Sequence, residues 1–313
     1  MSIDASVGTL FDTLREKLDL QWADHKRGRT RGIEVTGPDN SQTSLVGHLN
    51  LIHPHRVQIL GDTEIDYLNA LGPAARSDMI NQLFSGITDL IIIGDGARIP
   101  DGISQRAAAT TTPIFTSSLP TQQLVNYLQY YLTNLFAEKT TLHGVFMEVF
   151  SLGMLITGAA SVGKSELALE LIARGHRLVA DDAAVFAKTA PDVINGHCPE
   201  MLRDFLEVRG LGILNIRAMF GDSAIKQNRN LRLILKLEPM NEAEIRKIDR
   251  LYGSRDRRDI LGVEIPEITL PVAPGRNLAI LAEAAARNHM LNLKGFDASK
   301  LFMERQSRYL DQE

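Results

Sequence analysis

The sequence predicts an α/β protein of two domains, on the basis of three observations. Its 313 residues are enough for about two domains of ordinary size. Short apolar runs rich in β-branched residues alternate with segments whose apolar residues recur every three or four positions, a pattern typical of alternating strands and helices. In the second half, an apolar run leads into a complete phosphate-loop (P-loop) motif and then into a helical segment. We therefore expect an N-terminal α/β domain over residues 1–136 and a P-loop domain with C-terminal helices over residues 137–313.

The N-terminal domain is expected to alternate helices and strands. Helical spacing predicts a helix within residues 2–20, a shorter one over 63–71 and a long one over 121–136. Apolar, β-branched character predicts strands at 33–36, 90–94 and 112–116. The polar stretch 137–141, which follows the long helix, is the expected domain junction.

Two patterns in this domain resemble binding motifs but are incomplete. Gly94-Asp95-Gly96 follows a strand, yet a third glycine is missing and Pro100 interrupts the helix that a dinucleotide site requires. His53 and His55 flank Pro54, but no further set of Cys, His or carboxylate residues completes a metal site. Nothing in residues 1–136 indicates an activity.

The P-loop motif follows the pattern G-x-x-x-x-G-K-[ST]. Its glycines let the backbone N–H groups face phosphate oxygens, and the N-terminus of the following helix adds partial positive charge. In such a loop the lysine reaches the outer phosphates and the serine hydroxyl ligates their Mg²⁺. The residues predicted to bind the phosphates of a nucleotide are Gly158, Ala159, Ala160, Ser161, Val162, Gly163, Lys164 and Ser165.

Acidic residues follow the next predicted strand. Asp181 and Asp182 stand at its carboxyl end, where open α/β sheets bind ligands and where carboxylates can serve Mg²⁺ or an attacking hydroxyl. Adjacent residues on an extended chain point to opposite faces, so the two aspartates should have different tasks. Further on, Glu207 and Arg209 precede a glycine-flanked turn, which indicates either backbone close to a ligand or a structural turn with surface charges.

The composition of the chain limits its expected partners and its expected cellular compartment. A net charge of −4 gives no general reason to expect nucleic acid or an anionic membrane as partner. Cys198 is the only cysteine, which excludes an intramolecular disulfide and fits a reducing compartment. The beginning of the chain lacks the features of a secretory signal, and the apolar region 145–162 contains Glu148 and predicts strands instead of a membrane span. We expect a cytoplasmic protein.

Four segments match the motifs of one family in order and spacing. They are residues 158–165, Val179-Ala180-Asp181-Asp182, residues 206–215 and Pro271-Val272-Ala273-Pro274-Gly275-Arg276-Asn277. Together they resemble bacterial HPr kinase/phosphorylase, and residues 56–61 resemble the N-terminal domain of that family. The resemblance implies a kinase that uses ATP and Mg²⁺ to phosphorylate a serine of HPr, or of a homologous phosphocarrier protein. It also implies reversal with inorganic phosphate, release of pyrophosphate, and a homohexamer.

The resemblance also implies roles for individual residues. Lys164 would hold the nucleotide phosphates, while Ser165 and Glu207 would serve Mg²⁺. The implied catalytic residues are His143, Lys164, Asp182 and Arg250. Asp182 would take the proton of the serine in the forward direction and return one in the reverse direction, with the His143 side chain beside it. Arg250 would neutralise charge on the transferring phosphoryl group.

Two segments qualify the resemblance. Ala273 stands where the family usually has a basic residue, in a segment that serves dephosphorylation, so the forward activity is the better supported one. Residues 252–259 are polar and basic, which indicates either a mobile loop that closes over nucleotide and partner or a solvated surface loop.

The C-terminal region is expected to be helical, with one helix after the N-cap Asn277 and another over 298–309. In the family these helices dock HPr and neighbouring subunits. Two other functions stay open from the residues alone: an ATP-dependent kinase with a different protein or small-molecule target, and a non-catalytic nucleotide sensor. A proton acceptor at Asp182 beside His143 argues against the sensor.

Overall fold

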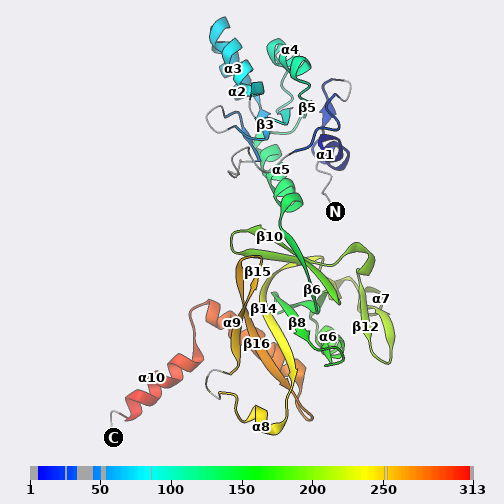
Figure 1. Ribbon diagram of the computed structural model, residues 1–313, viewed down its shortest axis with the longest axis vertical. Helices are drawn as coiled ribbons and strands as arrows, with labels where there is room; N and C mark the ends of the chain where they lie inside the picture. The colour runs from blue at the N-terminus through cyan, green and yellow to red at the C-terminus, as the bar shows by residue number, and fades with distance from the viewer. Residues whose placement is uncertain are drawn as a thin grey trace. The chain divides into compact units, whose positions relative to one another are not determined.

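The structure is a computed structural model that describes residues 6–24, 27–33, 45–50, 54–85, 87–249, 251 and 253–310. The chain divides into two compact units, Met1–Phe136 and Ala137–Glu313, and each unit contains its own sheet and helices (Figure 1). None of the helices in the described ranges combines the length and the apolar character that crossing a bilayer requires.

The first unit is built on a five-stranded sheet of order β1-β5-β4-β3-β2. Strands β2 to β5 are parallel to their neighbours, and β1 is antiparallel to β5. The strands are β1 (Gln21–Trp22), β2 (Val46–His48), β3 (Val57–Leu60), β4 (Leu90–Ile93) and β5 (Ile114–Thr116). The helices are α1 (Val7–Leu14), α2 (Asp62–Ala70), α3 (Pro73–Ser85), α4 (Asp101–Thr110) and α5 (Thr121–Phe136).

Strand β4 is buried because helices cover both faces of this sheet. Leu90 and Ile92 pack in a cluster with residues of α1 and α5, while Ile91 and Ile93 pack with residues of α2, α3 and α4. All four side chains are fully buried, and each contributes about 2 kcal/mol by leaving water. The two-sided cover explains why the strand has a continuous apolar sequence instead of an alternating one.

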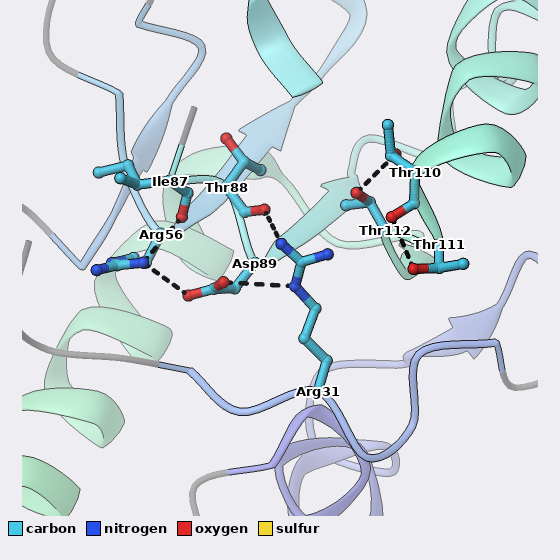
Figure 2. A network of polar contacts seen from close by, with 8 residues as sticks. All are labelled: Arg31, Arg56, Ile87, Thr88, Asp89, Thr110, Thr111 and Thr112. Carbon is cyan, nitrogen blue, oxygen red and sulfur yellow. Dashed lines mark hydrogen bonds and ion pairs between the residues drawn. The ribbon is translucent and has the colours of Figure 1, made fainter. Parts of the chain in front are cut away.

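Two arginines and an aspartate join the amino-terminal edge of this sheet to the segment after α1 (Figure 2). Asp89 pairs with the buried Arg56 (Nη1 to Oδ2, 3.5 Å) and with Arg31 (Nε to Oδ1, 3.4 Å). Arg31 also donates from Nη2 to the carbonyl oxygen of Thr88 at 3.0 Å. If the starts of β3 and β4 moved apart, Arg56 and Asp89 would be left as buried charges without compensation, which is strongly destabilising. The network therefore holds these two strand starts together.

Asp95 closes the opposite, carboxyl edge of the same sheet. It follows β4 in a left-handed conformation (φ 58°), and its Oδ1 accepts the N–H of Thr121 at 2.9 Å. Its Oδ2 accepts the N–H of Asp62 at 3.2 Å. One carboxylate therefore caps the first turns of α5 and α2, where the partial positive charge of a helix favours an anion.

The second unit contains a nine-stranded sheet and a separate two-stranded ribbon. The order in the large sheet is β6-β10-β11-β14-β8-β7-β9, and β16 pairs with both β14 and β15. Its strands are β6 (Lys139–His143), β7 (Val145–Val149), β8 (Leu152–Gly158), β9 (Arg177–Ala180), β10 (Ala183–Ala190), β11 (Val193–His197), β14 (Asn228–Pro239), β15 (Arg255–Ile260) and β16 (Val263–Val272). The ribbon consists of β12 (Phe205–Val208) and β13 (Gly212–Asn215).

The helices of this unit are α6 (Lys164–Ala173), α7 (Ile216–Phe220), α8 (Glu242–Ile245), α9 (Leu278–Leu293) and α10 (Ala298–Leu310), with 3₁₀ turns at Glu200–Leu202 and Asp222–Ala224. Side chains of α6 and α9, such as Leu171 and Ala282, share a core with Ile156 of β8. On the other face of β8, Leu155 packs with Phe186 of β10. The central strands are thus covered by helices on one face and by strands on the other.

Several sequence expectations for single elements are confirmed. Helix α5 has the predicted bounds, and α6 is followed by Gly175 in the left-handed conformation (φ 91°) that ends a helix. Asn277 caps α9 by accepting the N–H of Ile280 at 3.0 Å. The N-terminal helix is shorter than its apolar pattern, because α1 ends at Leu14 and turns follow. Of the strand expected at 33–36, residues 34–36 lie outside the described residues, as does His53.

Two polar segments form strands that the sequence did not indicate. The polar segment at the expected domain junction contains strand β6, which pairs with β10. Residues 255–259, expected to be a loop, belong to strand β15, whose pairing with β16 overrides their charged sequence. No helix starts at the Gly94-Asp95-Gly96 turn, as expected: residues 94–100 are not helical, and α4 begins only at Asp101, with Pro100 as its N-cap.

Candidate active site

Several strand ends of the second unit meet at one edge of its sheet. Strands β8 and β14 are parallel, and Gly158 at the end of β8 pairs with Leu237. Strand β9 runs the same way as β8, since both are antiparallel to β7. Across this edge the N–H of Gly144 donates to the carbonyl oxygen of Asp182 at 3.1 Å. The glycine-rich loop and the Asp181–Asp182 pair therefore lie at the same edge, where open α/β sheets bind ligands.

The loop from Gly158 to Ser165 has a backbone that depends on its glycines. Gly158 has a φ of 145°, and a Cβ there would lie 2.6 Å from the carbonyl oxygen of Leu237. Gly163, the N-cap of α6, has a φ of 99°. The Lys164 ammonium folds back over the loop and donates to the carbonyl oxygens of Gly158 (3.1 Å) and Ala159 (2.9 Å). The loop thus keeps a cation beside the first turn of α6.

A cleft of about 240 Å³ opens beside this loop. It is lined by backbone and side chains from the loop, from the end of β9 and from β12, so it gathers most of the residues that the sequence analysis singled out. The lining residues are Gly144, Ala160, Ser161, Gly163, Lys164, Ser165, Glu166, Asp181, Asp182, Glu207 and Arg209. One ammonium and one guanidinium therefore share the cleft with four carboxylates.

Asp181 and Asp182 occupy different environments, as adjacent residues at a strand end should. Asp181 is partly buried, and its Oδ2 accepts the N–H of Glu207 at 2.8 Å. Burial raises the pKa of the Asp181 carboxyl, opposed by hydrogen bonds from backbone N–H groups and reinforced by the carboxylates of Asp182 and Glu207. Asp182 has a left-handed backbone (φ 59°), and its side chain is 83% exposed.

His143 lies beside Asp182 because of strand pairing. In the register of β6 and β10, His143 is opposite Ala183, the residue after Asp182. The His143 Nδ1 is 3.7 Å from Asp182 Oδ1, and the imidazole is 84% exposed. The two groups can hydrogen-bond after a small movement and stay accessible to a macromolecular substrate.

Arg209 adds a contact that the sequence does not reveal. Its Nη1 donates to the hydroxyl of Ser161, which joins the β12–β13 ribbon to the glycine-rich loop. The sequence placed Arg209 near a glycine-flanked turn but gave no sign of which segment that turn would meet, since 48 residues separate the two partners.

The other predicted site residues have simple outcomes. Arg250 lies outside the described residues. The segment from Pro271 to Asn277 comprises the last two residues of β16 and the turn before α9, and none of its residues lines the cleft. In the described ranges, no three His, Cys, Asp or Glu side chains are placed to hold a metal by themselves. Mg²⁺ commonly needs only one or two protein carboxylates beside phosphate and water oxygens. Glu207 offers such a carboxylate in the cleft, and Ser165 offers a hydroxyl oxygen.

Both domains of the chain match known proteins. Residues 134–306 match the HPr Serine kinase C-terminal domain, and residues 5–132 match the HPr Serine kinase N terminus. The HPr kinase/phosphorylases of Stenotrophomonas maltophilia (strain K279a) and Xanthomonas axonopodis pv. citri (strain 306) are each 46% identical over 312 residues, covering 99% of both chains. The solved HPr(Ser) kinase/phosphatase from Coxiella burnetii is 36% identical with a TM-score of 0.45, covering 52% of this chain and 98% of that one.

The matches define a mixed α/β protein with an N-terminal domain and a C-terminal kinase domain, which is the predicted fold class. The chain belongs to the HPr kinase/phosphorylase family. The resemblance that four short segments indicated is thereby confirmed over the full length.

Proposed function

We propose that this protein transfers the γ-phosphoryl group of ATP to a serine of HPr, or of a homologous phosphocarrier protein, and reverses the reaction with inorganic phosphate. The observation that carries the proposal is the single cleft in which Lys164, Asp182 and Glu207 meet the glycine-rich loop. The names of its full-length relatives support the same activity. We assign the catalytic role to residues 137–313 and a regulatory or unknown role to residues 1–136.

The glycine-rich loop is assigned to the nucleotide. The N–H groups of residues 158–165 and the first turn of α6 would surround the phosphate oxygens, and the Lys164 ammonium would leave its two carbonyl partners for the outer phosphates. Ser165 and Glu207 would hold Mg²⁺, which supplies charge neutralisation between phosphate groups when bound. The donor set fits this hard cation, since it consists of oxygens and the nearby carboxylates repel one another.

Asp182 is assigned as the proton acceptor. As the serine oxygen bonds to the γ-phosphorus and the bond from that phosphorus to the ADP oxygen breaks, the serine proton passes to the Asp182 carboxylate. The imidazole of His143, 3.7 Å away, orients that carboxylate. Arg250 is assigned to the charge of the transferring group, by the family motif alone.

The reverse reaction uses the same groups in the opposite order. An oxygen of inorganic phosphate bonds to the phosphorus of phosphoserine, the serine–phosphorus bond breaks, and Asp182 returns the proton to the serine oxygen. Pyrophosphate leaves from the position of the outer nucleotide phosphates. Ala273 lies outside the lining of the cleft, so we expect this direction to survive in spite of the departure from the family pattern.

Incubation of the purified protein with ATP, Mg²⁺ and HPr, followed by addition of phosphate, tests the proposal. We expect phosphoserine to form on HPr and then to disappear with stoichiometric release of pyrophosphate. Phosphorylation of a different protein or of a small molecule, with none on HPr, would contradict the target. Nucleotide binding without any transfer would leave only a sensor.

We further propose a homohexamer in the cytoplasm. The support is the family resemblance for the assembly, and the single cysteine for a reducing compartment. Light scattering of the full chain at micromolar concentration measures the first, and fractionation of cells measures the second. A monomeric mass would exclude the hexamer.

A further inference from the structure

A hollow in the first unit lies between α3 and α4 and contains two arginines and no carboxylate. The two helices lie side by side (Figure 1), since apolar side chains of both belong to one buried cluster. Beside this contact opens a hollow of about 380 Å³, which we call the α3–α4 hollow, with residues of α3 on one side and residues of α4 on the other. Its polar lining residues are Arg76, Ser77 and Asn81 of α3 and Gln105 and Arg106 of α4.

The eight arginines of the first unit fall into two groups. Three of them, Arg76, Arg98 and Arg106, form no ion pair with any residue that the structure describes. Exposed arginines without a partner are ordinary on a protein surface. What distinguishes these three is that all of them line the α3–α4 hollow or the hollow next to it. The arginines that do have a carboxylate partner are Arg15, Arg27, Arg29, Arg31 and Arg56.

The neighbouring hollow, of about 410 Å³, has a balanced lining. Arg76 lines both hollows, and Arg98, from the segment between β4 and α4, lines the second one. Asp62 and Asp101 also line the second hollow, so its two guanidinium groups face two carboxylates. The α3–α4 hollow has two guanidinium groups and no carboxylate, so the positive charge is concentrated there.

The lining of the α3–α4 hollow suits an anion. The cleft of the second unit combines Lys164 and Arg209 with four carboxylates, whereas the α3–α4 hollow offers no carboxylate to a cation. Its guanidinium groups are planar forks of donors that match the oxygens of a carboxylate or a phosphate. The hydroxyl of Ser77 and the amides of Asn81 and Gln105 can bind neutral polar groups of the same ligand. A hollow of this volume accommodates a small molecule.

We propose that the α3–α4 hollow binds a small organic dianion, whose two negative charges are paired by Arg76 and Arg106. A phosphate monoester and a dicarboxylate both carry this charge, and the probes of the experiment distinguish them. The site lies entirely within the first unit. It gives residues 1–136 a binding role that does not depend on the reaction proposed for residues 137–313.

Equilibrium dialysis of the full chain with labelled succinate, and separately with labelled glycerol phosphate, tests the proposal. Mg²⁺ and a saturating non-hydrolysable ATP analogue are present, so that the glycine-rich loop is not available to the probe. We expect one of the probes to bind once per chain, and its identity assigns the dianion to a dicarboxylate or to a phosphate monoester. Arg76→Gln and Arg106→Gln should each weaken this binding about tenfold, because each removes a hydrogen-bonded charge pair.

Arg15→Gln is the matched control, because it removes an exposed arginine whose partner is Glu16 and which lines neither hollow. Its affinity for the probe should equal that of the wild-type chain. Arg76→Lys keeps the charge and loses the planar fork, so we expect an affinity between those of Arg76→Gln and the wild-type chain. The side chains of Arg76 and Arg106 belong to exposed residues, so urea unfolding should show all variants to be as stable as the wild-type chain.

Two results would overturn the site: no binding of either probe at millimolar concentration, or equal affinities for the wild-type chain, Arg76→Gln and Arg106→Gln. Because HPr is absent from this experiment, either result would leave the proposed function intact. A wild-type chain that binds the probe and phosphorylates no HPr would keep this site and overturn the proposed function instead.

Discussion

Asp95 in the first unit and Asp182 in the second have the same local geometry and different surroundings. Each follows a buried strand at its carboxyl end, and each has a left-handed backbone, with φ values of 58° and 59°. The Asp95 carboxylate accepts N–H groups from two helix starts. The Asp182 carboxylate is exposed in a cleft, with the His143 imidazole 3.7 Å away.

The helices beside the two aspartates differ in what lies at their first turns. At the start of α2 and α5, a carboxylate of the chain itself lies where an anionic ligand would bind. At the start of α6, within the described residues, no carboxylate accepts the N–H groups of the first turn. The same strand–glycine–helix arrangement can therefore be closed by a carboxylate of the chain or left open, as at α6, where we propose that phosphate binds. What decides between them is whether the chain supplies its own anion.

The largest difference between the two aspartates should appear in Asp182→Ala. Loss of the proposed proton acceptor is expected to slow both phosphorylation and phosphorolysis of HPr about a thousandfold, because positioned bases contribute on that scale. Binding of ATP, measured by calorimetry, should persist. Near wild-type transfer by this variant would remove Asp182 from the mechanism.

The glycines of the loop should differ in what they tolerate. Gly158→Ala places a Cβ 2.6 Å from a backbone oxygen at a φ of 145°, and we expect about 3 kcal/mol of lost stability in urea unfolding. Gly163→Ala meets no atom within 4 Å and only has to adopt a φ of 99°, so about 1 kcal/mol is expected. Equal losses would mean that backbone conformation, and not the close approach, determines both.

In the first unit, Asp95→Ala should cost stability without affecting the reaction. The variant loses the acceptor for two helix starts, so a loss of about 2 kcal/mol is expected in thermal or urea unfolding. Asp95→Asn keeps one acceptor oxygen and should lose about half as much. If the variant phosphorylates HPr more slowly under conditions in which it is fully folded, Asp95 also contributes to the reaction.

The smallest effect is expected from Asp181→Asn. The pKa of the Asp181 carboxyl is higher in the folded protein than in the unfolded chain. The protonated carboxyl therefore stabilises the fold at a pH below its pKa in the unfolded chain. This contribution is lost as the pH rises through its pKa in the folded protein. At pH 7 the ionised, half-buried carboxylate of Asp181 therefore destabilises the folded protein, and the uncharged amide of Asn at this position avoids that destabilisation. Because solvent still reaches the group, the gain should be under about 1 kcal/mol, and it should vanish below pH 4. Urea unfolding at both pH values measures it; destabilisation at pH 7 would contradict the sign.

Local signals predicted the elements whose stability is local. The 16-residue helix α5, the glycine after α6 and the Asn277 cap all follow from spacing and capping chemistry within a few residues. The same holds for the glycine-rich loop, whose motif spans eight positions. Strands β6 and β15 could not be predicted in this way, because their polar sequences become strands only through pairing with β10 and β16.

For the candidate site, the sequence indicated single residues but not the contacts between distant segments. Motifs indicated Lys164, Asp182 and Glu207 separately, and the cleft brings them together. The contact from Arg209 to Ser161 could not be predicted, since it depends on how a distant ribbon meets the loop.

Strand β6 has a consequence for how the sequence before the site can vary. Only two residues separate the end of α5 at Phe136 from the start of β6 at Lys139, and His143 is the last residue of the strand. Since successive side chains alternate, deleting one residue within β6 while keeping the register at its start would turn the imidazole to the opposite face of the nine-stranded sheet. Deleting two would keep the face but shorten the reach by about 7 Å. The length of this polar segment is therefore constrained far more tightly than its composition.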